Sequence, residues 1–326
     1  MKKLLLVIAF ATLGVSAAEL KIGIIGCDTS HTIAFTKLMN VEKDPLCHGH
    51  RVVTAYQWGS KDIVSSTNRY PKYIAELKTM GVEMSSSIAE LLLKVDAVCL
   101  ETNDGRPHCE QALEVFKSGK PVFIDKPIAA SLADTLRIVE AAKKHNAKFF
   151  CSSALRYTDN AQKARAGGFG QIRGADVWTP EQFEPTQSDY YWYAIHGAEP
   201  LFTIMGCGCT EVSAMRAETE DVLVGRWNDG RLGVMRAMNY CKPGATYGGM
   251  IFPYKGKPVE MGGYEGYKKL LLSILNFFET GVVPFPPEET VEIYAFMEAA
   301  AESVRRGGTP VKLEEVLKKA RAEVAK

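Results

Sequence analysis

Short apolar runs alternate with helical patterns through the first half of the chain. The helical stretches repeat apolar residues every three or four positions, and the apolar runs are only as long as buried strands. This alternation is typical of a parallel sheet whose strands are joined by helices. The expected strands lie at 21–26, 51–59, 97–103, 121–127 and 148–154, with helices at 88–95, 108–119 and 131–146. We therefore expect a Rossmann-like, doubly wound α/β domain over residues 19–150.

The pattern changes from about Arg173. Residues 212–240 alternate apolar and polar side chains around Asn228-Asp229-Gly230, a turn sequence that favours a hairpin. A second hairpin is expected at 248–261, and two apolar-striped helices at 266–281 and 287–308. Strands that follow one another in this way predict a large, mostly antiparallel sheet. Residues 151–326 are thus expected to form an α+β domain for substrate binding and oligomerisation, with the site in the cleft between the domains.

The first 18 residues have the layout of a secretory signal peptide. Two lysines precede an apolar stretch from Leu4 to Val15, and small residues follow at 16–18. A membrane anchor is the alternative, but the stretch is short for a bilayer span. We expect cleavage near Ala18, export to the periplasm or the medium, and no membrane span in the mature chain.

The composition limits the classes of partner that this chain is expected to bind. The formal net charge is +1, so there is no electrostatic footprint for nucleic acid or acidic lipid. The chain has eight cysteines, and disulfide bonds between them are one alternative in an exported protein. Cys99 and Cys151 lie inside apolar runs, where a thiol behaves as a small hydrophobe, and we expect most of the eight to be core residues.

Polar side chains gather where the expected strands end, which is where open parallel sheets bind ligands. These positions hold Asp28, Ser30, His31, Glu101, Asn103, Asp104, His108, Asp125, Lys126, Arg156 and Tyr157. A separate stretch brings His196 and Glu199 into an expected helix, directly after the aromatic run 190–193.

Three stretches resemble the Gfo/Idh/MocA family of sugar and inositol oxidoreductases. "VFIDKPIAAS" is similar to its Glu-Lys-Pro strand end, residues 97–127 match its fourth and fifth strands in spacing, and "IHGAEPLFTIMG" resembles its histidine-containing helix start. The resemblance runs over nearly all of the mature chain. It implies Lys126 and His196 as acid–base residues, with Glu199 kept beside them, and a homo-oligomer.

The same resemblance implies NAD(P) as the cofactor. It places cofactor contacts at Gly26, Asp28, Ser30, His31, Glu101, Asn103 and Asp125. A dinucleotide fingerprint, however, needs glycines where this chain has Asp28 and His31. The second strand also ends in Gln57-Trp58-Gly59 rather than in an acid for the adenosine ribose, and Trp192 replaces the family's aspartate four residues before the histidine.

A divalent metal is therefore an alternative to NAD(P). Asp, Glu and His side chains suit zinc, manganese or iron, and the candidate ligands are Asp28, His31, Glu101, His108 and His196. The alternative to a metal site is a purely structural network of hydrogen-bonded polar side chains near Arg156.

Three functions stay open. One is a family-type oxidoreductase of a sugar or polyol. Another is a non-redox enzyme that abstracts a proton from, or eliminates a group from, a keto-sugar. The last is a sugar-binding protein on a retired enzyme scaffold. The candidate substrate residues are His108, Arg156, Tyr157, Trp192 and Tyr193, and a carbohydrate is the expected ligand because aromatic faces stack on sugar rings.

Overall fold

The computed structural model describes residues 19–326, so the expected signal peptide and its cleavage site lie outside the described part of the chain. The first domain is built on a six-stranded sheet in the order β3-β2-β1-β4-β5-β6, and every neighbouring pair is parallel. Its strands are β1 (Lys21–Ile25), β2 (Arg51–Tyr56), β3 (Glu83–Ser85), β4 (Ala97–Leu100), β5 (Val122–Ile124) and β6 (Phe149–Cys151). The expected doubly wound parallel sheet is confirmed.

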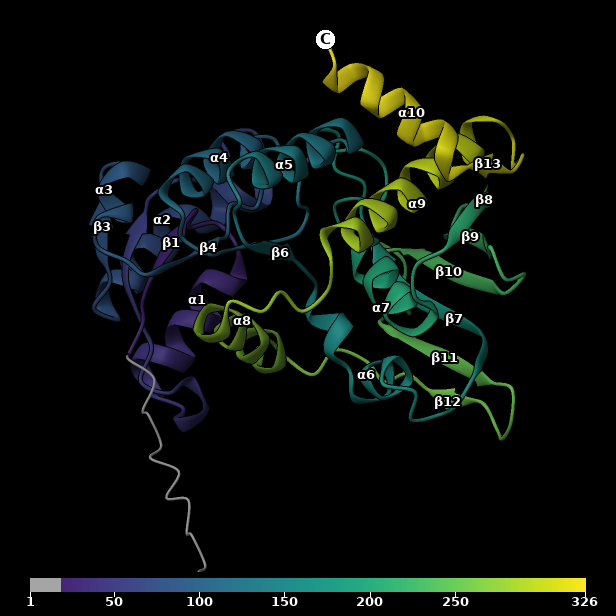
Figure 1. Ribbon diagram of the computed structural model, residues 1–326, viewed down its shortest axis with the longest axis horizontal. Coiled ribbons are helices and arrows are strands. Elements are labelled where there is room, and N and C mark those ends of the chain that lie inside the picture. The colour runs from purple at the N-terminus through teal and green to yellow at the C-terminus, as the bar shows by residue number, and fades with distance from the viewer. Residues whose placement is uncertain (1–18) are drawn as a thin grey trace, which may run out of the picture.

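Helices and short turns connect these strands. They are α1 (Ser30–Thr36), a π-turn (Lys37–Val41), a 3₁₀ turn (Pro45–Cys47), α2 (Val64–Thr79), α3 (Ile88–Leu92), α4 (His108–Ser118) and α5 (Leu132–Lys144). The start of α5 follows from its sequence, because Ser131 Oγ accepts the Asp134 N–H at 3.1 Å and donates to the Asp134 carboxylate at 2.8 Å. Figure 1 shows α4 and α5 above the sheet and α1 below it.

The second domain carries a seven-stranded sheet in the order β12-β11-β7-β10-β9-β8-β13. All its pairs are antiparallel except β7 with β10, so the expectation of a mostly antiparallel sheet is confirmed. Both expected hairpins form, one joining β9 to β10 and the other joining β11 to β12. The strands are β7 (Ile172–Glu181), β8 (Cys209–Arg216), β9 (Glu220–Trp227), β10 (Leu232–Asn239), β11 (Gly248–Pro253), β12 (Val259–Glu260) and β13 (Val311–Lys312).

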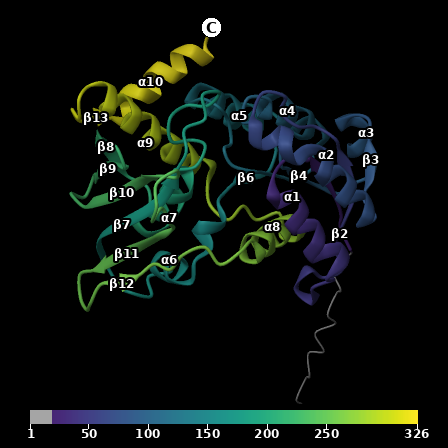
Figure 2. The same cartoon turned by 180° about the vertical axis from the view of Figure 1, so that it is seen from behind.

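The second half of the chain also contains a 3₁₀ turn (Ala154–Tyr157), α6 (Asp159–Arg165), α7 (Ile195–Met205), α8 (Lys268–Thr280), α9 (Pro287–Arg305) and α10 (Leu313–Val324). Of these, α7 and α9 pack on the second sheet, while α8 lies beside α1 (Figures 1 and 2). Among the described residues, none of the helices combines the length and the apolar character needed to cross a bilayer.

The two domains share their cores. One helix of the second half, α8, packs on the first sheet, where Leu270 and Ile274 join Ile22 and Ile24 in one buried cluster. In the other direction, α9 residues join the core that α4 and α5 build over the opposite face of that sheet. The expected boundary at residue 150 also falls inside β6. The cleft between the domains is consequently lined by segments that cross over in both directions.

The cysteines are free thiols, as the apolar context of Cys99 and Cys151 favours. Five of the eight are buried, while Cys207 and Cys241 are exposed, so these two differ from the expected core positions. Both follow strand or helix ends in loops of the second domain.

Gly26 fixes the distance between the ends of β1 and β4. Its φ is +94°, and a Cβ built on it would lie 2.5 Å from the backbone nitrogen of Thr102. Glycine is therefore required twice, for its backbone conformation and for the close approach of two chain segments.

We expect Gly26→Ala to lower the free energy of unfolding by clearly more than the ~1–3 kcal/mol that a strained backbone alone costs. Gly81→Ala is the matched control, because Gly81 has φ +80° and nothing near its Cβ position. Urea denaturation of both variants separates the two effects. Equal losses in both variants would show that the Gly26–Thr102 contact carries no cost.

Candidate functional site

A cavity of about 470 Å³ lies between the two domains. It opens at the carboxyl ends of β1, β4 and β5, which is the place expected for a ligand of an open parallel sheet. Of the residues expected at the site, it is lined by Ser30, His31, Asn103, Asp125, Lys126, Trp192, Tyr193 and His196. The volume is in the range of pockets that hold small molecules.

Lys126 follows β5 and reaches into this cavity. Its ammonium nitrogen lies 5.5 Å from the ring centroid of Tyr193 and 5.9 Å from that of Trp192. Aromatic faces attract a cation at such distances. Within residues 19–326 the lysine has no carboxylate partner at ion-pair distance, so its charge is available to a ligand.

His196 lies at the second position of α7 and borders the same cavity. Its Nδ1 is 2.7 Å from Ser153 Oγ. Burial, with further contributions from Lys126 and His31, holds the pKa of His196 well below its usual value. The ring is thus neutral near pH 7, and Nε2 remains as the nitrogen that a ligand can use.

Three side chains from adjacent strand ends meet at the wall of the cavity. His31 Nδ1 lies 2.9 Å from Asp125 Oδ1 and 3.6 Å from Glu101 Oε2. All three side chains are at least 95% buried. Burial opposes protonation of His31, but Asp125 and then Glu101 outweigh it and raise the pKa of His31 to about 10. Burial and the Asp125 charge raise the pKa of Glu101.

Asp28 does not reach the cavity. Its carboxylate is fully buried and accepts the backbone N–H of Asn103 at 3.0 Å and that of Ser60 at 3.1 Å. Burial raises the pKa of Asp28, although these two hydrogen bonds act in the opposite direction. Asp28 therefore joins the loop after β1 to the loops after β2 and β4. Its carboxylate is turned away from the cavity, so we correct its assignment as a cofactor contact or a metal ligand.

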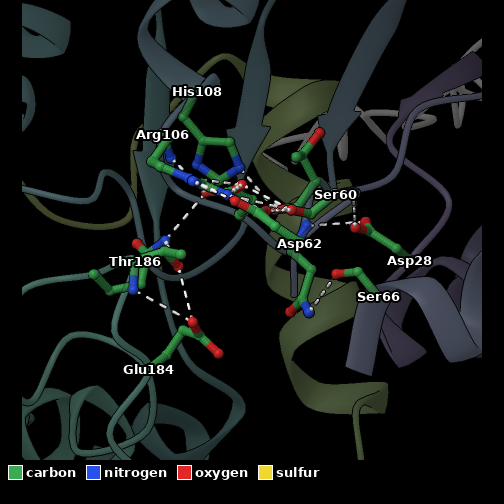
Figure 3. Close-up of polar contacts among 12 residues, drawn as sticks. Asp28, Ser60, Asp62, Ser66, Arg106, His108, Glu184 and Thr186 are labelled. Carbon is green, nitrogen blue, oxygen red and sulfur yellow. Dashed lines mark hydrogen bonds and ion pairs between the residues drawn. The ribbon is translucent and has the colours of Figure 1, made fainter. Parts of the chain in front are cut away.

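A polar network continues from this point across the strand ends (Figure 3). Ser60 Oγ donates to Asp62 and to Asp104, and Arg106 pairs with both carboxylates. Gln187, from the second domain, donates to Asp104 at 3.1 Å. We name these five residues the Asp104 network.

The loops lack two glycines of the usual dinucleotide fingerprint. Asp28 and His31 stand at these two positions, and Ser60, in the loop after β2, bonds to Asp28 and Asp104. Asp62, the first acid after β2, is paired with Arg106.

Arg156 and Glu199 are partners beneath the cavity rather than members of its lining. Arg156 is only 1% exposed. Its Nε lies 2.5 Å from Glu199 Oε2, and its Nη1 lies 2.6 Å from Glu289 Oε1. Tyr157 is turned away as well, and its hydroxyl accepts a hydrogen bond from Ser273 on α8. We correct the assignments of Arg156 and Tyr157 to substrate, and Glu199 contacts the site only through its neighbours.

His108 is also a structural residue. Its two ring nitrogens bond to the carbonyls of Thr102 at 2.7 Å and Ile128 at 3.1 Å, and it is fully buried. Burial lowers the pKa of His108, so the ring is neutral and occupied on both sides. This corrects its assignment both to substrate and to a metal.

Several lining residues were not found from the sequence. The cavity is also bordered by Thr29, Ser65, Arg69, Gln182, Tyr240, Tyr247, Tyr264 and Tyr267. Tyr264 and Tyr267 immediately precede α8, so recognising that α8 packs on the first sheet is the signal that would have brought them to the site.

We expect Asp28→Ala to lower the free energy of unfolding by about 2–4 kcal/mol, because two buried N–H groups lose their acceptor. Asp96→Ala is the control: Asp96 also accepts one backbone N–H, from Lys21, but is exposed. Chemical denaturation followed by circular dichroism measures both. A loss in Asp28→Ala no larger than in Asp96→Ala would contradict the structural role of Asp28.

Comparison with known proteins agrees with the fold. Residues 20–153 match the family described as "Oxidoreductase family, NAD-binding Rossmann fold", the Gfo/Idh/MocA family. Inositol 2-dehydrogenase 3 of Saccharopolyspora erythraea is 37% identical over 81 residues, which cover 23% of this chain and 24% of that protein. The chain thus spans about a quarter of the length of the curated relatives that it matches.

Solved structures cover far more of the chain. The scyllo-inositol dehydrogenase of Lactobacillus casei, with bound NAD(H) and scyllo-inositol, has a TM-score of 0.71 at 16% identity, over 91% of this chain and 99% of that one. The WlbA dehydrogenase of Bordetella pertussis, in complex with NADH and UDP-GlcNAcA, has a TM-score of 0.67 at 18% identity, over 90% and 97%. Residues 20–153 thus match the Gfo/Idh/MocA oxidoreductase family, and the described chain shares the two-domain fold of these dehydrogenases.

Proposed function

We propose that this chain is a sugar- or polyol-converting enzyme in which Lys126 and His196 move a proton on a hydroxyl or carbonyl group of the substrate. The observation that carries the proposal is that both side chains border one cavity, each with a free polar end. The family description and the inositol dehydrogenases among its relatives support the substrate class.

The two residues have different tasks. The ammonium of Lys126 donates a hydrogen bond to a substrate oxygen and stabilises negative charge that develops there. The neutral ring of His196 exchanges a proton with the same oxygen or a neighbouring one through Nε2. The rings of Trp192, Tyr193 and Tyr247 border this space and offer faces for the apolar side of a sugar.

Ser153 positions the histidine. Its Oγ accepts the N–H of Leu155 at 3.2 Å, and Nδ1 of His196 is the other group within hydrogen-bond distance. When the serine hydroxyl accepts the proton of Nδ1, Nε2 carries no proton and faces the substrate as a base. It takes the proton of a substrate hydroxyl, which makes the ring an imidazolium, and in the reverse reaction the imidazolium returns that proton from Nε2 as an acid.

Hydride transfer is the family's reaction, and family resemblance supports NAD(P) as its partner. Asp28 and His31 stand at glycine positions of the dinucleotide fingerprint, and this favours a second candidate function. In it, the same lysine and histidine exchange a proton beside the carbonyl of a keto-sugar without redox chemistry. The test therefore measures both reactions on one panel of inositols, aldoses and their keto derivatives.

We expect Lys126→Met and His196→Asn each to lower turnover at least about 100-fold, the usual contribution of acid–base catalysis. Lys117→Met, on the exposed side of α4, and His145→Asn, just after α5, are the matched controls. Product formation is followed by NMR. Unchanged turnover in both site variants would overturn the assignment of these residues.

Adding NADH or NADPH separates the two reactions. Non-redox chemistry predicts uptake of solvent deuterium beside the carbonyl without any change in NADH absorbance, because the dinucleotide contacts are missing. Oxidation of NADH by a keto-sugar would instead establish the oxidoreductase. Sugar binding without turnover, and with an affinity that Lys126→Met leaves intact, would make the chain a binding protein.

A further inference from the structure

The cluster of His31, Glu101 and Asp125 contains three buried carboxylate oxygens without a hydrogen bond. They are both Glu101 Oε atoms and Asp125 Oδ2, while His31 Nδ1 is in ion-pair contact with Asp125 Oδ1 at 2.9 Å but lacks a well-aligned hydrogen bond. Buried polar atoms are nearly always paired, so three unpaired oxygens in a single cluster call for a bound group. Two of the three residues also border the cavity, which gives such a group a path of entry.

From this arrangement we propose that His31, Glu101 and Asp125 bind one divalent transition-metal ion, such as Zn²⁺, at the wall of the substrate cavity. The donor atoms of the three side chains lie within 4.8 Å of one another. Around an ion with bonds of about 2.1 Å, neighbouring ligand atoms are roughly 3.0–3.4 Å apart. The observed distances from Nδ1, 2.9 Å and 3.6 Å, are close to this range.

The charges of the cluster favour the same occupant. With a protonated histidine, the two carboxylates leave one net negative charge in a buried place, which is costly. A divalent ion bound by two carboxylates and a neutral imidazole leaves no net charge. One nitrogen and two or more oxygens are donors suited to zinc, manganese or iron, and a site with three protein ligands keeps a position open.

A second cluster of similar composition provides a contrast. His48, His50 and Glu279 also lie close together, with Glu279 Oε1 2.7 Å and 2.6 Å from the two rings. His50 Nδ1, however, accepts the N–H of Leu20 at 3.0 Å, so its Nε2 carries a proton and donates to Glu279. The three atoms that lie closest together in this cluster, Glu279 Oε1, His48 Nδ1 and His50 Nε2, are thus already paired with one another.

Lys126 and His196 border the same cavity, so an ion held by the cluster has its open position on the space where they act. It would hold a substrate hydroxyl or carbonyl oxygen there. This role rests on the proposed function, whereas metal binding itself does not, and it is measured without any substrate.

The test uses the whole chain, stripped with a chelator and titrated with Zn²⁺ alone in a calorimeter. We expect one equivalent to bind, and Glu101→Gln to weaken binding about tenfold or more, since even residues behind the ligands have effects of that size. Glu279→Gln removes a carboxylate from the paired cluster and should bind as the unaltered chain does. Absence of binding, equal binding by Glu101→Gln, or a loss in Glu279→Gln alone would each overturn the proposal.

A measurement on the unaltered chain covers the case in which Glu101→Gln does not fold. Co²⁺ bound to one nitrogen and carboxylate oxygens gives weak visible bands and no intense thiolate-to-cobalt band. An intense thiolate band at one equivalent would assign the ion to cysteines and would falsify the site.

Discussion

The close approach of Gly26 to Thr102 sets the geometry on which the cavity depends. It brings the loop after β1 against the loop after β4 with no room for a side chain between them. Because His31 follows the first loop and Glu101 starts the second, this contact also helps to bring their side chains to 3.6 Å from each other. The Asp28 carboxylate holds the loops after β1, β2 and β4 together, because it accepts the N–H groups of Ser60 and Asn103.

A buried ion network supports the other side of the cavity. Arg156 joins Glu199 on α7 to Glu289 on α9, and Arg165 pairs with the same Glu289. Breaking such a buried pair typically costs about 3–5 kcal/mol, so the helix that carries His196 is anchored to a neighbouring helix and to the chain after β6. His196 thus lies on a helix that is tied to α9 by buried ion pairs.

Most of the fold, but only part of the site, follows from the sequence. Alternation of strands and helices predicts the parallel sheet because period and length are local properties, and the Asn228-Asp229-Gly230 turn predicts its hairpin for the same reason. The packing of α8 on the first sheet does not follow, because an apolar stripe does not identify its partner. The sequence places Arg156 and His108 after strands, which is why they are expected in the cavity. It does not show whether the partners of such a charged or polar side chain are other protein groups or a ligand.

The charges of the side chains at the strand ends decide which kind of ligand these loops favour. A dinucleotide-binding loop presents bare N–H groups and glycines to a doubly negative pyrophosphate. Here the corresponding positions bring in one carboxylate that satisfies N–H groups from within and one imidazole that faces two more carboxylates. The first change removes bare N–H groups that could face a phosphate. The second brings two carboxylates against the imidazole, and this buried excess of acidic groups is the electrostatic basis of the metal site that we propose.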